Sequence, residues 1–512
     1  MSNHLFFLWL NLGIFTPLLF SFVVWKMTVV DQARRWTVWV LALSFLALLS
    51  NTLTVAGPAE SKLIEPLGQW FLPVGQWFLV DALNAIPLSL FAALCLGMAM
   101  LVPKHKLTPQ WLAGILWLCA TTCATYASNN LLIFVLGWAG SLAPFLVMRA
   151  FALPDNRMPA GTETAKGAAA TNRDKTIPRF SKVVLALSLA SLCIGVGLLV
   201  YALPNASWSD ALSFSLPRTG DNSLLFAAFA FLMGAVVLRK GLFPAHSWVV
   251  TAFERGPLLP LTLLLNGHLG AFLVVRVVLP MLPDEAHTYW PVFSTLSLLT
   301  AAYVALVGLV ERTPRRLFAL VAISQSAFLL AGLQSYSAIG VAGALVLWQV
   351  VAVSTTMLAA VFAGLEARLG MALKKDGFLG LATGAPRLAV FFAVGGLALV
   401  GLPLTLGFPA EDLLLQGTLA TNPYLGVVLP VVTAINAFSI VRLFARLFLG
   451  QPVAAAHNVA DALRRERWVL TAAVFFLVLG GLFPSQVMRL PALAAERIVG
   501  LVSGQSHTAR LP

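Results

Sequence analysis

Apolar stretches of about 20 residues recur along almost the entire chain, separated by short polar breaks. A helix needs about 20 residues to cross the hydrocarbon core of a bilayer. The stretches are apolar on every helical face, whereas the strands of a transmembrane barrel alternate between apolar and polar positions. The pattern therefore predicts an all-α, polytopic membrane protein with about fourteen spans, centred near residues 15, 46, 92, 117, 139, 192, 231, 268, 300, 325, 350, 398, 436 and 478.

The composition and the charge distribution agree with this prediction. Of the 512 residues, 59% are hydrophobic and only 10% are charged, against roughly 25% charged residues in soluble domains. Most of the 33 lysines and arginines fall in loops that follow odd-numbered spans. The positive-inside rule then predicts that these loops are cytoplasmic and that both termini are periplasmic. The net charge of +13 is spread over these loops, which argues against a nucleic-acid partner.

The predicted spans divide the chain into four segments. We expect the first three spans in 1–105, a first repeat of five spans in 106–282, a second repeat of five in 283–450, and the last span with the tail in 451–512. The longest polar insertion, 154–179, is expected to be a flexible loop. The sequence has no motif for a nucleotide, an iron–sulfur cluster or a catalytic zinc. We therefore expect no enzymatic activity, cofactor or metal in this chain alone.

Two spans carry signals that interrupt a helix. In the seventh, Arg239 and Lys240 come directly before Gly241 and Pro244. In the twelfth, the interruption is longer, because three helix-breaking residues are followed at once by two acids: Pro403, Gly407, Pro409, Glu411 and Asp412. Proline and glycine weaken the backbone hydrogen-bond ladder of a helix. We therefore predict that spans seven and twelve are broken inside the membrane.

The two broken spans share the string Phe-Pro-Ala, at residues 243–245 and 408–410. They lie five spans apart, so the two copies run in opposite directions through the membrane. This arrangement is typical of inverted repeats, in which each broken helix frees backbone groups to line a polar pathway. We predict two inverted repeats of five helices each.

Several ionisable residues fall inside or beside the apolar spans. A charge near the bilayer centre costs at least ~2.5 kcal/mol on insertion scales, so such residues need partners or water and are functional candidates. We interpret the group as a proton pathway, provided that burial and neighbouring charges bring the pKa values into the working range. Its candidate members are Asp81, Arg239, Lys240, His246, Glu254, His268, Glu411 and Asp412.

The predicted roles within this pathway differ. Lys240 and Glu411 lie beside the helix breaks, which favours proton handling over structural pairing. Arg239 holds its proton too tightly to pass it on and is expected to be a fixed charge that tunes its neighbour. His268 lies within the eighth span, either as part of a relay or as a core histidine with its hydrogen bonds satisfied.

Two candidates have a structural alternative of equal weight. Glu254 is followed by Arg255 near the end of a span, so an interfacial ion pair is as good an interpretation as a role in conduction. Asp81 opens the third span and either belongs to the pathway or caps that helix.

The ordered set of motifs between residues 75 and 450 resembles the antiporter-like membrane subunits of respiratory complex I and of Mrp cation/proton antiporters. The resemblance implies two inverted five-helix repeats around a central polar axis and a location in the bacterial inner membrane. It is carried by Phe78-Leu-Val-Asp-Ala-Leu83, Lys240-Gly-Leu-Phe-Pro-Ala-His-Ser-Trp248, Thr313-Pro-Arg-Arg316 with Ser324-Gln325, and Gly401-Leu-Pro with Glu411-Asp412.

The sequence departs from that family at positions that normally carry charge. The fifth-helix Trp-Glu pair is Trp138-Ala139 here, which removes the acid that normally partners the lysine of the seventh helix. In gapless register that lysine aligns with Arg239, one residue before Lys240, and His268 occupies a place where many members carry lysine. The eleventh-helix pattern of two histidines and a lysine falls on Trp348, Ala352 and Thr356.

With these departures, the sequence most closely resembles the DabB family, the membrane subunits of the DabA–DabB inorganic-carbon accumulation systems. The resemblance implies that an inward proton or sodium flux through this chain drives CO2 hydration by a cytoplasm-facing DabA-like partner, and that the partner, which is similar to β-carbonic anhydrases, carries the zinc. The rival interpretations are a subunit of a respiratory NADH–quinone oxidoreductase, a subunit of an Mrp-type cation/proton antiporter, and a purely structural scaffold. The scaffold fits poorly with several costly mid-membrane charges.

Overall fold

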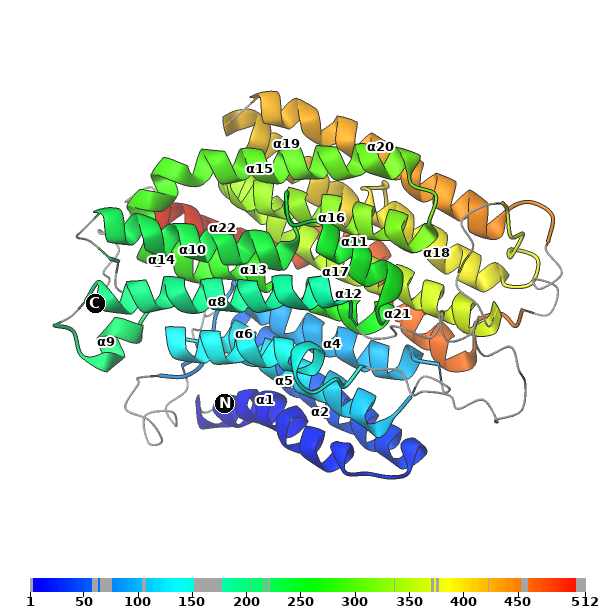
Figure 1. The fold of residues 1–512 in the computed structure, drawn as a ribbon, viewed down its shortest axis with the longest axis horizontal. Coiled ribbons are helices and arrows are strands. Elements are labelled where there is room, and N and C mark those ends of the chain that lie inside the picture. The colour runs from blue at the N-terminus through cyan, green and yellow to red at the C-terminus, as the bar shows by residue number, and fades with distance from the viewer. Residues whose placement is uncertain are drawn as a thin grey trace.

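The computed structural model describes residues 3–57, 63–64, 76–103, 107–151, 177–203, 205–214, 217–218, 222–335, 337–369, 373, 377–421, 423–452 and 459–502. The described chain is almost entirely helical, and most of its helices run along the long axis of the molecule (Figure 1). The exception to the predicted all-α class is a short antiparallel pair, β1 (Leu63–Ile64) and β2 (Leu79–Val80). Most of the predicted loop 154–179 lies outside the described residues.

The N-terminal part of the chain forms one side of the bundle, where α1 packs against α2 and α5 (Figure 1). Its helices are α1 (Asn3–Trp25), α2 (Val30–Val55), α4 (Ala85–Leu101), α5 (Pro109–Ala127), α6 (Leu131–Leu146), α8 (Arg179–Tyr201) and α9 (Trp208–Leu212). The next part contains α10 (Asn222–Lys240), α11 (Ser247–Arg255), α12 (Leu258–Asn266), α13 (Leu269–Leu273), the π-helix Val274–Val278 and α14 (Leu279–Met281).

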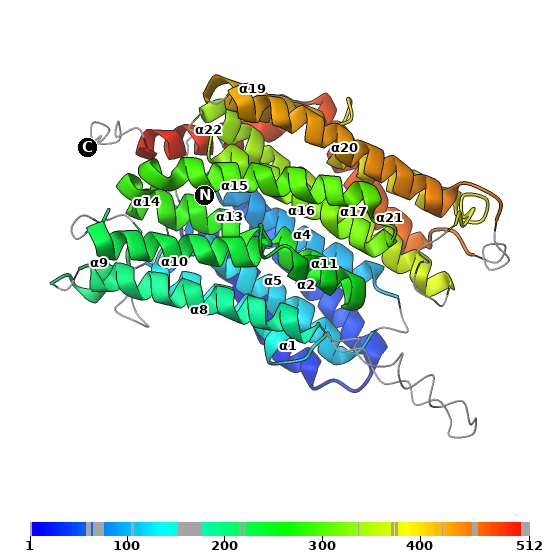
Figure 2. The same cartoon turned by 45° about the horizontal axis from the view of Figure 1, so that its top comes forward.

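The remaining helices surround α17, which lies in the middle of the bundle (Figure 1). The most apolar 18-residue stretch of α17 is completely buried. They are α15 (Pro283–Val310), α16 (Pro314–Leu333), α17 (Ala338–Leu369), α18 (Pro386–Leu399), α19 (Gly407–Thr421), α20 (Pro423–Phe448), α21 (Arg464–Leu482) and α22 (Pro484–Val502). Figure 2 shows α15 lying between α10 and α20, and α15 contacts both helices.

The bundle is that of a polytopic membrane protein. Within the described residues, nine helices are long and apolar enough to cross a membrane, and α21 with α22, bent by 81°, makes a tenth. Three further apolar helices, α4, α6 and α18, are shorter than 18 residues. Each predicted span centre lies in a helix or at a helix junction. Fourteen crossings, the inverted repeats and the four-segment division stay predictions.

The predicted break in the seventh span is confirmed, because α10 ends at Lys240 and α11 begins only at Ser247. Gly241 has a positive φ of 68°, and a Cβ there would lie 2.5 Å from Val249 Cγ2, so both backbone conformation and space require glycine. Trp248 Nε1 donates a hydrogen bond to the carbonyl of Leu238 at 2.7 Å. This bond satisfies a carbonyl near the interrupted end of α10 and joins the two halves of the span.

The twelfth span is also broken, but not through all the residues that the sequence suggested. The helix stops at Leu399 and resumes at Gly407. The prediction that Pro409 interrupts the ladder is wrong, because Pro409 lies in the first turn of α19, where a proline's missing N–H has no intrahelical partner to lose. The second Phe-Pro-Ala string is therefore helical, whereas the first lies within the break between α10 and α11.

A third break occurs in the eighth span, which was predicted to be one continuous helix. Helix α12 ends at Asn266, and His268 adopts a left-handed conformation with φ 39° before α13 begins. A five-residue π-helix follows at Val274–Val278. The Asn-Gly pair at 266–267 was the available signal, since both residue types favour helix ends. His268 is thus placed at a helix junction.

Candidate functional site

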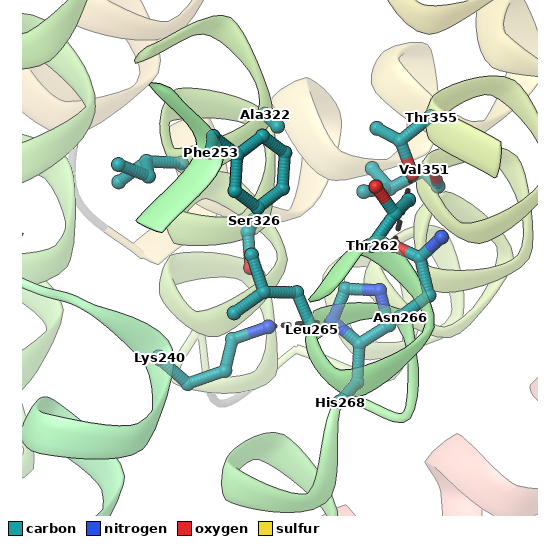
Figure 3. A pocket seen from close by; sticks show the side chains of 11 residues that line it. Lys240, Phe253, Thr262, Leu265, Asn266, His268, Ala322, Ser326, Val351 and Thr355 are labelled. Carbon is teal, nitrogen blue, oxygen red and sulfur yellow. Dashed lines mark hydrogen bonds between the residues drawn. The ribbon is translucent and has the colours of Figure 1, made fainter. Parts of the chain in front are cut away.

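The first candidate site is a direct contact between two nitrogen bases at helix breaks. Lys240, the last residue of α10, places its Nζ 2.5 Å from Nδ1 of His268 at the α12–α13 junction (Figure 3). Both residues are buried, with exposed fractions of 4% and 1%. A Cβ on Gly270 would lie 2.7 Å from Lys240 Cγ. The close approach of the lysine stem therefore requires a glycine in α13.

A small cavity of about 20 Å³ adjoins this pair. Its walls include the polar side chains of Thr262, Ser326 and Thr355 as well as Lys240 and His268, and the rest of the lining is largely apolar (Figure 3). A cavity needs roughly 10–15 Å³ to hold one water molecule, and that water needs at least two polar partners. The cavity has the size and the polar groups for about one water beside the Lys240–His268 contact.

Helix α17 supports the junction that presents His268. Asn266 donates to the carbonyl of Ala352 at 2.9 Å and to Thr356 Oγ1 at 2.8 Å, and it accepts from Thr355 Oγ1 at 2.9 Å. The Trp348 ring lies edge-on to His268, with centroids 5.3 Å apart. This support was not predictable from the sequence. Trp348, Ala352 and Thr356 are the positions that, by resemblance, replace the eleventh-helix pattern of two histidines and a lysine.

Arg239 points away from the Lys240–His268 contact. Its Nη2 donates to Ser141 Oγ at 2.8 Å, and its guanidinium carbon lies 4.9 Å from the ring centroid of Trp138. Its Nη1 is buried without a hydrogen-bond partner. Among the described residues, neither Arg239 nor Lys240 forms an ion pair with a carboxylate. The site is therefore built from nitrogen bases and hydroxyl groups.

The second candidate site is the carboxyl group of Glu411 at the start of α19. A Cβ on Gly401, in the preceding break, would lie 2.5 Å from Glu411 Oε2, so the break and the side chain fit tightly together. Gln325 of α16 and Thr433 of α20 lie close to the carboxyl group. Both side chains interact with the carboxyl group, but Glu411 Oε1, both amide atoms of Gln325 and Thr433 Oγ1 are buried and none of them makes a hydrogen bond of ordinary length and angle. Such a cluster is typical of a site that holds ordered water.

Asp412 does not join Glu411. Its side chain is exposed on the outside of the bundle and accepts a hydrogen bond from Gln416 at 2.9 Å. Successive helical residues point about 100° apart, so the neighbour of an inward-facing residue is easily turned outward. Only one of the two predicted acids reaches the interior.

Asp81 forms an ion pair with Arg276 of the π-helix, at 2.7 Å. It also accepts hydrogen bonds from the N–H groups of Leu83 and Asn84. The carbonyl of Asp81 accepts from the N–H of Ala85 at 3.0 Å, and Asn84, the residue directly before α4, makes no side-chain capping bond. Asp81 therefore caps the turn that leads into α4, as the capping alternative predicted. Burial alone would raise the pKa of Asp81, but Arg276 and the two N–H groups hold it below its ordinary value.

The remaining candidates lie apart from both sites. Glu254 pairs with Arg316 at 3.3 Å, so the predicted ion pair exists but its partner is not Arg255. His246 is half-buried in the first break, and its ring centroid lies 5.1 Å from that of Tyr303. Its Nδ1 is buried without a partner. The structure thus brings together Lys240 and His268, and it separates them from Asp81 and Glu254, which are paired with arginines.

The chain matches a known family over more than half of its length. The family described as NADH:quinone oxidoreductase/Mrp antiporter, TM, matches residues 128–436. NAD(P)H-quinone oxidoreductase chain 4 2 of Synechococcus sp. (strain JA-3-3Ab) is 26% identical over 401 residues, which cover 74% of this chain and 69% of that protein. NADH-quinone oxidoreductase subunit M of Rickettsia prowazekii (strain Madrid E) is 23% identical over 423 residues, or 82% of each chain.

Two solved structures have the same fold. A chain of respiratory complex I from Thermus thermophilus with bound NADH aligns with a TM-score of 0.78 and 24% identity, over 96% of this chain and 99% of that chain. A chain of the Mrp complex from Dietzia sp. DQ12-45-1b aligns with a TM-score of 0.77 and 18% identity, over 98% of both chains. Both structures are of assemblies in which the similar chain is one of several.

Proposed function

The chain belongs to the family of NADH:quinone oxidoreductase and Mrp antiporter membrane subunits, and from this premise we propose that it conducts protons through two titratable stations, the Lys240–His268 pair and Glu411. Ion translocation is the activity of the family. The residues that perform it, the identity of the ion and the partner enzyme are our proposal.

The 2.5 Å contact between Lys240 Nζ and His268 Nδ1 carries the proposal. When the ammonium group donates to Nδ1, the imidazole must accept and therefore be unprotonated at that nitrogen. One proton is thus held between two bases, and its arrival or departure changes the charge of a buried site. Because a buried charge without a carboxylate partner is costly, the pair releases or takes up a proton readily when a neighbouring charge changes.

Arg239 supplies such a fixed neighbouring charge. It holds its proton at any physiological pH and is anchored by Ser141 and Trp138. Its positive charge opposes a second positive charge on the adjacent Lys240. Arg239 is therefore the fixed charge that adjusts the proton affinity of Lys240. By resemblance, the acid that would pair with the lysine is absent, because Ala139 stands at its position.

We propose that the chain works within a hetero-complex in the bacterial inner membrane, with both termini periplasmic. Relatives with the same fold come from multi-subunit assemblies.

The proposed partner is a DabA-like, zinc-containing subunit that faces the cytoplasm, and the proposed coupled reaction is hydration of CO2 to bicarbonate. The chain's own contribution is the proton path. The replacement of the family's charged positions by Ala139, Ala352 and Thr356 supports a role outside the respiratory enzyme, because a respiratory relay uses a longer row of charges along the membrane axis.

Purification of the complex from native membranes in mild detergent tests the partner. The expected result is a stoichiometric companion protein that contains zinc. Companions that carry flavin and iron–sulfur clusters would replace this proposal with a respiratory subunit. Salt-sensitive growth after deletion of the chain, with no zinc protein bound, would replace it with an Mrp-type antiporter subunit.

Proton flux tests the stations themselves. The purified complex is reconstituted into proteoliposomes that contain a pH-sensitive dye, and a proton gradient is imposed. Glu411→Gln should slow the flux by about 100-fold, the scale of removing a positioned proton-transfer group. Asp412→Asn is the matched control, and its flux should equal that of the unchanged chain. Unchanged flux in Glu411→Gln, with normal assembly, would remove Glu411 from the path.

A further inference from the structure

The peptide plane between Gly267 and His268 determines where the imidazole of His268 points. His268 has a left-handed backbone conformation, with φ 39° and ψ 30°. The carbonyl of Gly267 and the N–H of His268 belong to one rigid plane, and rotation of this plane about the N–Cα bond of His268 is the angle φ. The N–H end of the plane donates to the carbonyl of Leu265 at 3.0 Å. Any group that holds the carbonyl end therefore also helps to fix the direction of the histidine side chain.

Tyr126 of α5 holds the carbonyl end of this plane. Its hydroxyl donates a hydrogen bond to the carbonyl of Gly267, although the two residues are 141 positions apart in the chain. The last carbonyls of a helix have no partner within that helix, and a buried carbonyl without a partner is costly. Both residues are buried, with Tyr126 only 1% exposed. The tyrosine hydroxyl therefore supplies a bond that the break between α12 and α13 requires.

The ring of Tyr126 is fixed by aromatic neighbours from three helices. Phe91 of α4 and Phe272 of α13 lie edge-on to it, with ring centroids 6.3 Å and 5.2 Å away. The ring centroid of Trp348 of α17 lies 6.0 Å from that of Tyr126 and 5.3 Å from that of His268. Aromatic pairs prefer such edge-on and tilted arrangements. The packing therefore leaves the hydroxyl little freedom to reach another acceptor.

The main chain of Tyr126 is anchored as well. Asn84, which is 0% exposed, donates from Nδ2 to the carbonyl of Tyr126 at 2.8 Å and to the carbonyl of Leu79 at 2.7 Å. These bonds join the end of α5 to the segment before α4. Tyr126 is therefore held at both its main chain and its ring, as a residue must be if it is to position another one.

His268 needs such support because its conformation is strained. Residues other than glycine rarely have a positive φ, and they keep it only where the surrounding structure imposes it. The side chain of Asn266 is bound by α17, and Tyr126 binds the next residue, Gly267. Without the hydroxyl, the plane can rotate and His268 can relax to a right-handed helical conformation. That change would turn its side chain away from Lys240 Nζ.

We propose that Tyr126 is a positioning residue for the Lys240–His268 pair: its hydroxyl holds the peptide plane before His268 in the orientation that directs Nδ1 to Lys240. This inference rests on the proposed function in one respect, that the pair titrates during transport. Among the described residues, the Tyr126 hydroxyl forms no hydrogen bond with the side chain of Lys240 or His268. Its effect on the pair therefore passes through the backbone.

The structure of the Tyr126→Phe complex tests the proposal directly. Phenylalanine keeps the ring and its contacts and removes only the hydroxyl. Electron cryo-microscopy of the purified complex should show His268 Nδ1 more than about 3.5 Å from Lys240 Nζ, beyond hydrogen-bond distance, with the rest of the bundle unchanged. An unchanged contact overturns the proposal. If Tyr126→Phe fails to assemble, Tyr126→Met takes its place, because it also lacks the hydroxyl and fills the space with a flexible side chain.

Proton flux in proteoliposomes measures the functional consequence. Tyr126→Phe should slow the flux at least about tenfold, because a small misplacement of a reacting group is costly. The matched control is Tyr289→Phe on α15, which removes the hydroxyl of a residue that is 37% exposed. Its flux should equal that of the unchanged chain.

The pH dependence of the flux separates positioning from a general structural role. A hydrogen bond from the ammonium group of Lys240 to His268 favours the protonated pair. When the histidine turns away, the pair should hold its proton less tightly, and the midpoint of the flux–pH profile should move by about one pH unit toward acid. Of the residues that line the adjoining cavity, only the pair itself is ionisable, and the fixed charge of Arg239 is unchanged. A slower flux with an unmoved midpoint would reduce Tyr126 to a structural role.

A double variant measures whether Tyr126 acts through the pair. In Lys240→Met the pair is absent, so adding Tyr126→Phe should change the residual flux by less than about twofold, whereas losses that multiply would place the role of Tyr126 elsewhere. Failure of this inference and failure of the proposed function are distinguishable. A lost contact with normal flux in Tyr126→Phe would keep the positioning role and remove the pair from the proton path. A kept contact in Tyr126→Phe, with Lys240→Met inactive, would do the reverse.

Discussion

The two ionisable sites of this protein use the same backbone device for different chemistry. Both Lys240 and Glu411 adjoin a helix break, and each is packed against a glycine that leaves room for it, Gly270 and Gly401. Lys240 has a protein partner, His268, beside a cavity for about one water. Glu411 has buried neighbours whose polar atoms are unsatisfied. The comparison teaches that a broken helix supplies space and polarity, while the side chains of neighbouring helices decide whether protein or water completes the site.

We expect the largest loss of proton flux from Lys240→Met, which tests the first of the two sites. The change keeps the length of the side chain and removes its nitrogen. Proton flux in proteoliposomes should fall by about 100-fold, because His268 loses the base with which it shares the proton. Glu411→Gln should lose as much activity by a different cause. A normal flux in Lys240→Met would mean that the first break is structural and that only the second site works.

Asn266→Leu separates support from chemistry at the first site. The change removes three hydrogen bonds to α17 and leaves buried partners unsatisfied, which should lower stability by about 2–4 kcal/mol. The measurement is the thermal unfolding temperature in detergent, compared with that of the unchanged chain. Equal unfolding temperatures would show that α17 does not hold the α12–α13 junction in place.

Gly401→Ala tests how tightly the second break encloses Glu411. A Cβ there meets the carboxyl at 2.5 Å, and the backbone has a φ of 70°, so the change should destabilise the protein by about 1–3 kcal/mol. Gly197→Ala is the control, since no atom lies within 4 Å of the added carbon and alanine favours the helix by about 1 kcal/mol. Opposite signs for the two variants are expected, and equal effects would contradict the close packing.

The smallest effect concerns pH and the paired acid Asp81. Its pKa is held below the ordinary value in the folded chain, so the carboxylate stabilises the fold above the unfolded pKa of about 3.9. That contribution is lost as the pH falls through the lower, folded pKa. Asp81→Asn should therefore flatten the acid side of the stability profile and leave flux near pH 7 unchanged. A loss of flux at neutral pH would return Asp81 to the proton pathway.

The sequence predicted the features that depend on local chemistry. Gly241 and Pro244 mark the first break because they act on the backbone at their own positions, and Pro403 marks the second in the same way. The break at His268 was missed because Gly267 alone is a weak signal inside a long apolar span. The position of the second break was predicted too broadly, since Pro409 is compatible with the first turn of a helix.

The partners of the ionisable groups were not predictable from spacing. Arg276 and Asp81 are 195 residues apart in the chain, and Arg239 and Ser141 are 98 apart. Such contacts depend on which helices pack together, which apolar periodicity does not determine when a helix is apolar on all faces. The two acids of α19 show the limit clearly: adjacent residues have opposite environments, one inside the bundle and one on its surface.

Infrared difference spectroscopy across a pH step tests the central claim, that Glu411 is a hydrated carboxyl group that takes up and releases a proton. The purified complex should show a carboxylic C=O band that appears on acidification and shifts promptly in D2O. The band should persist in Asp412→Asn and in Lys240→Met and be absent in Glu411→Gln. A band that survives in Glu411→Gln, or no carboxylic band in the unchanged protein at any pH at which it transports protons, would contradict the account.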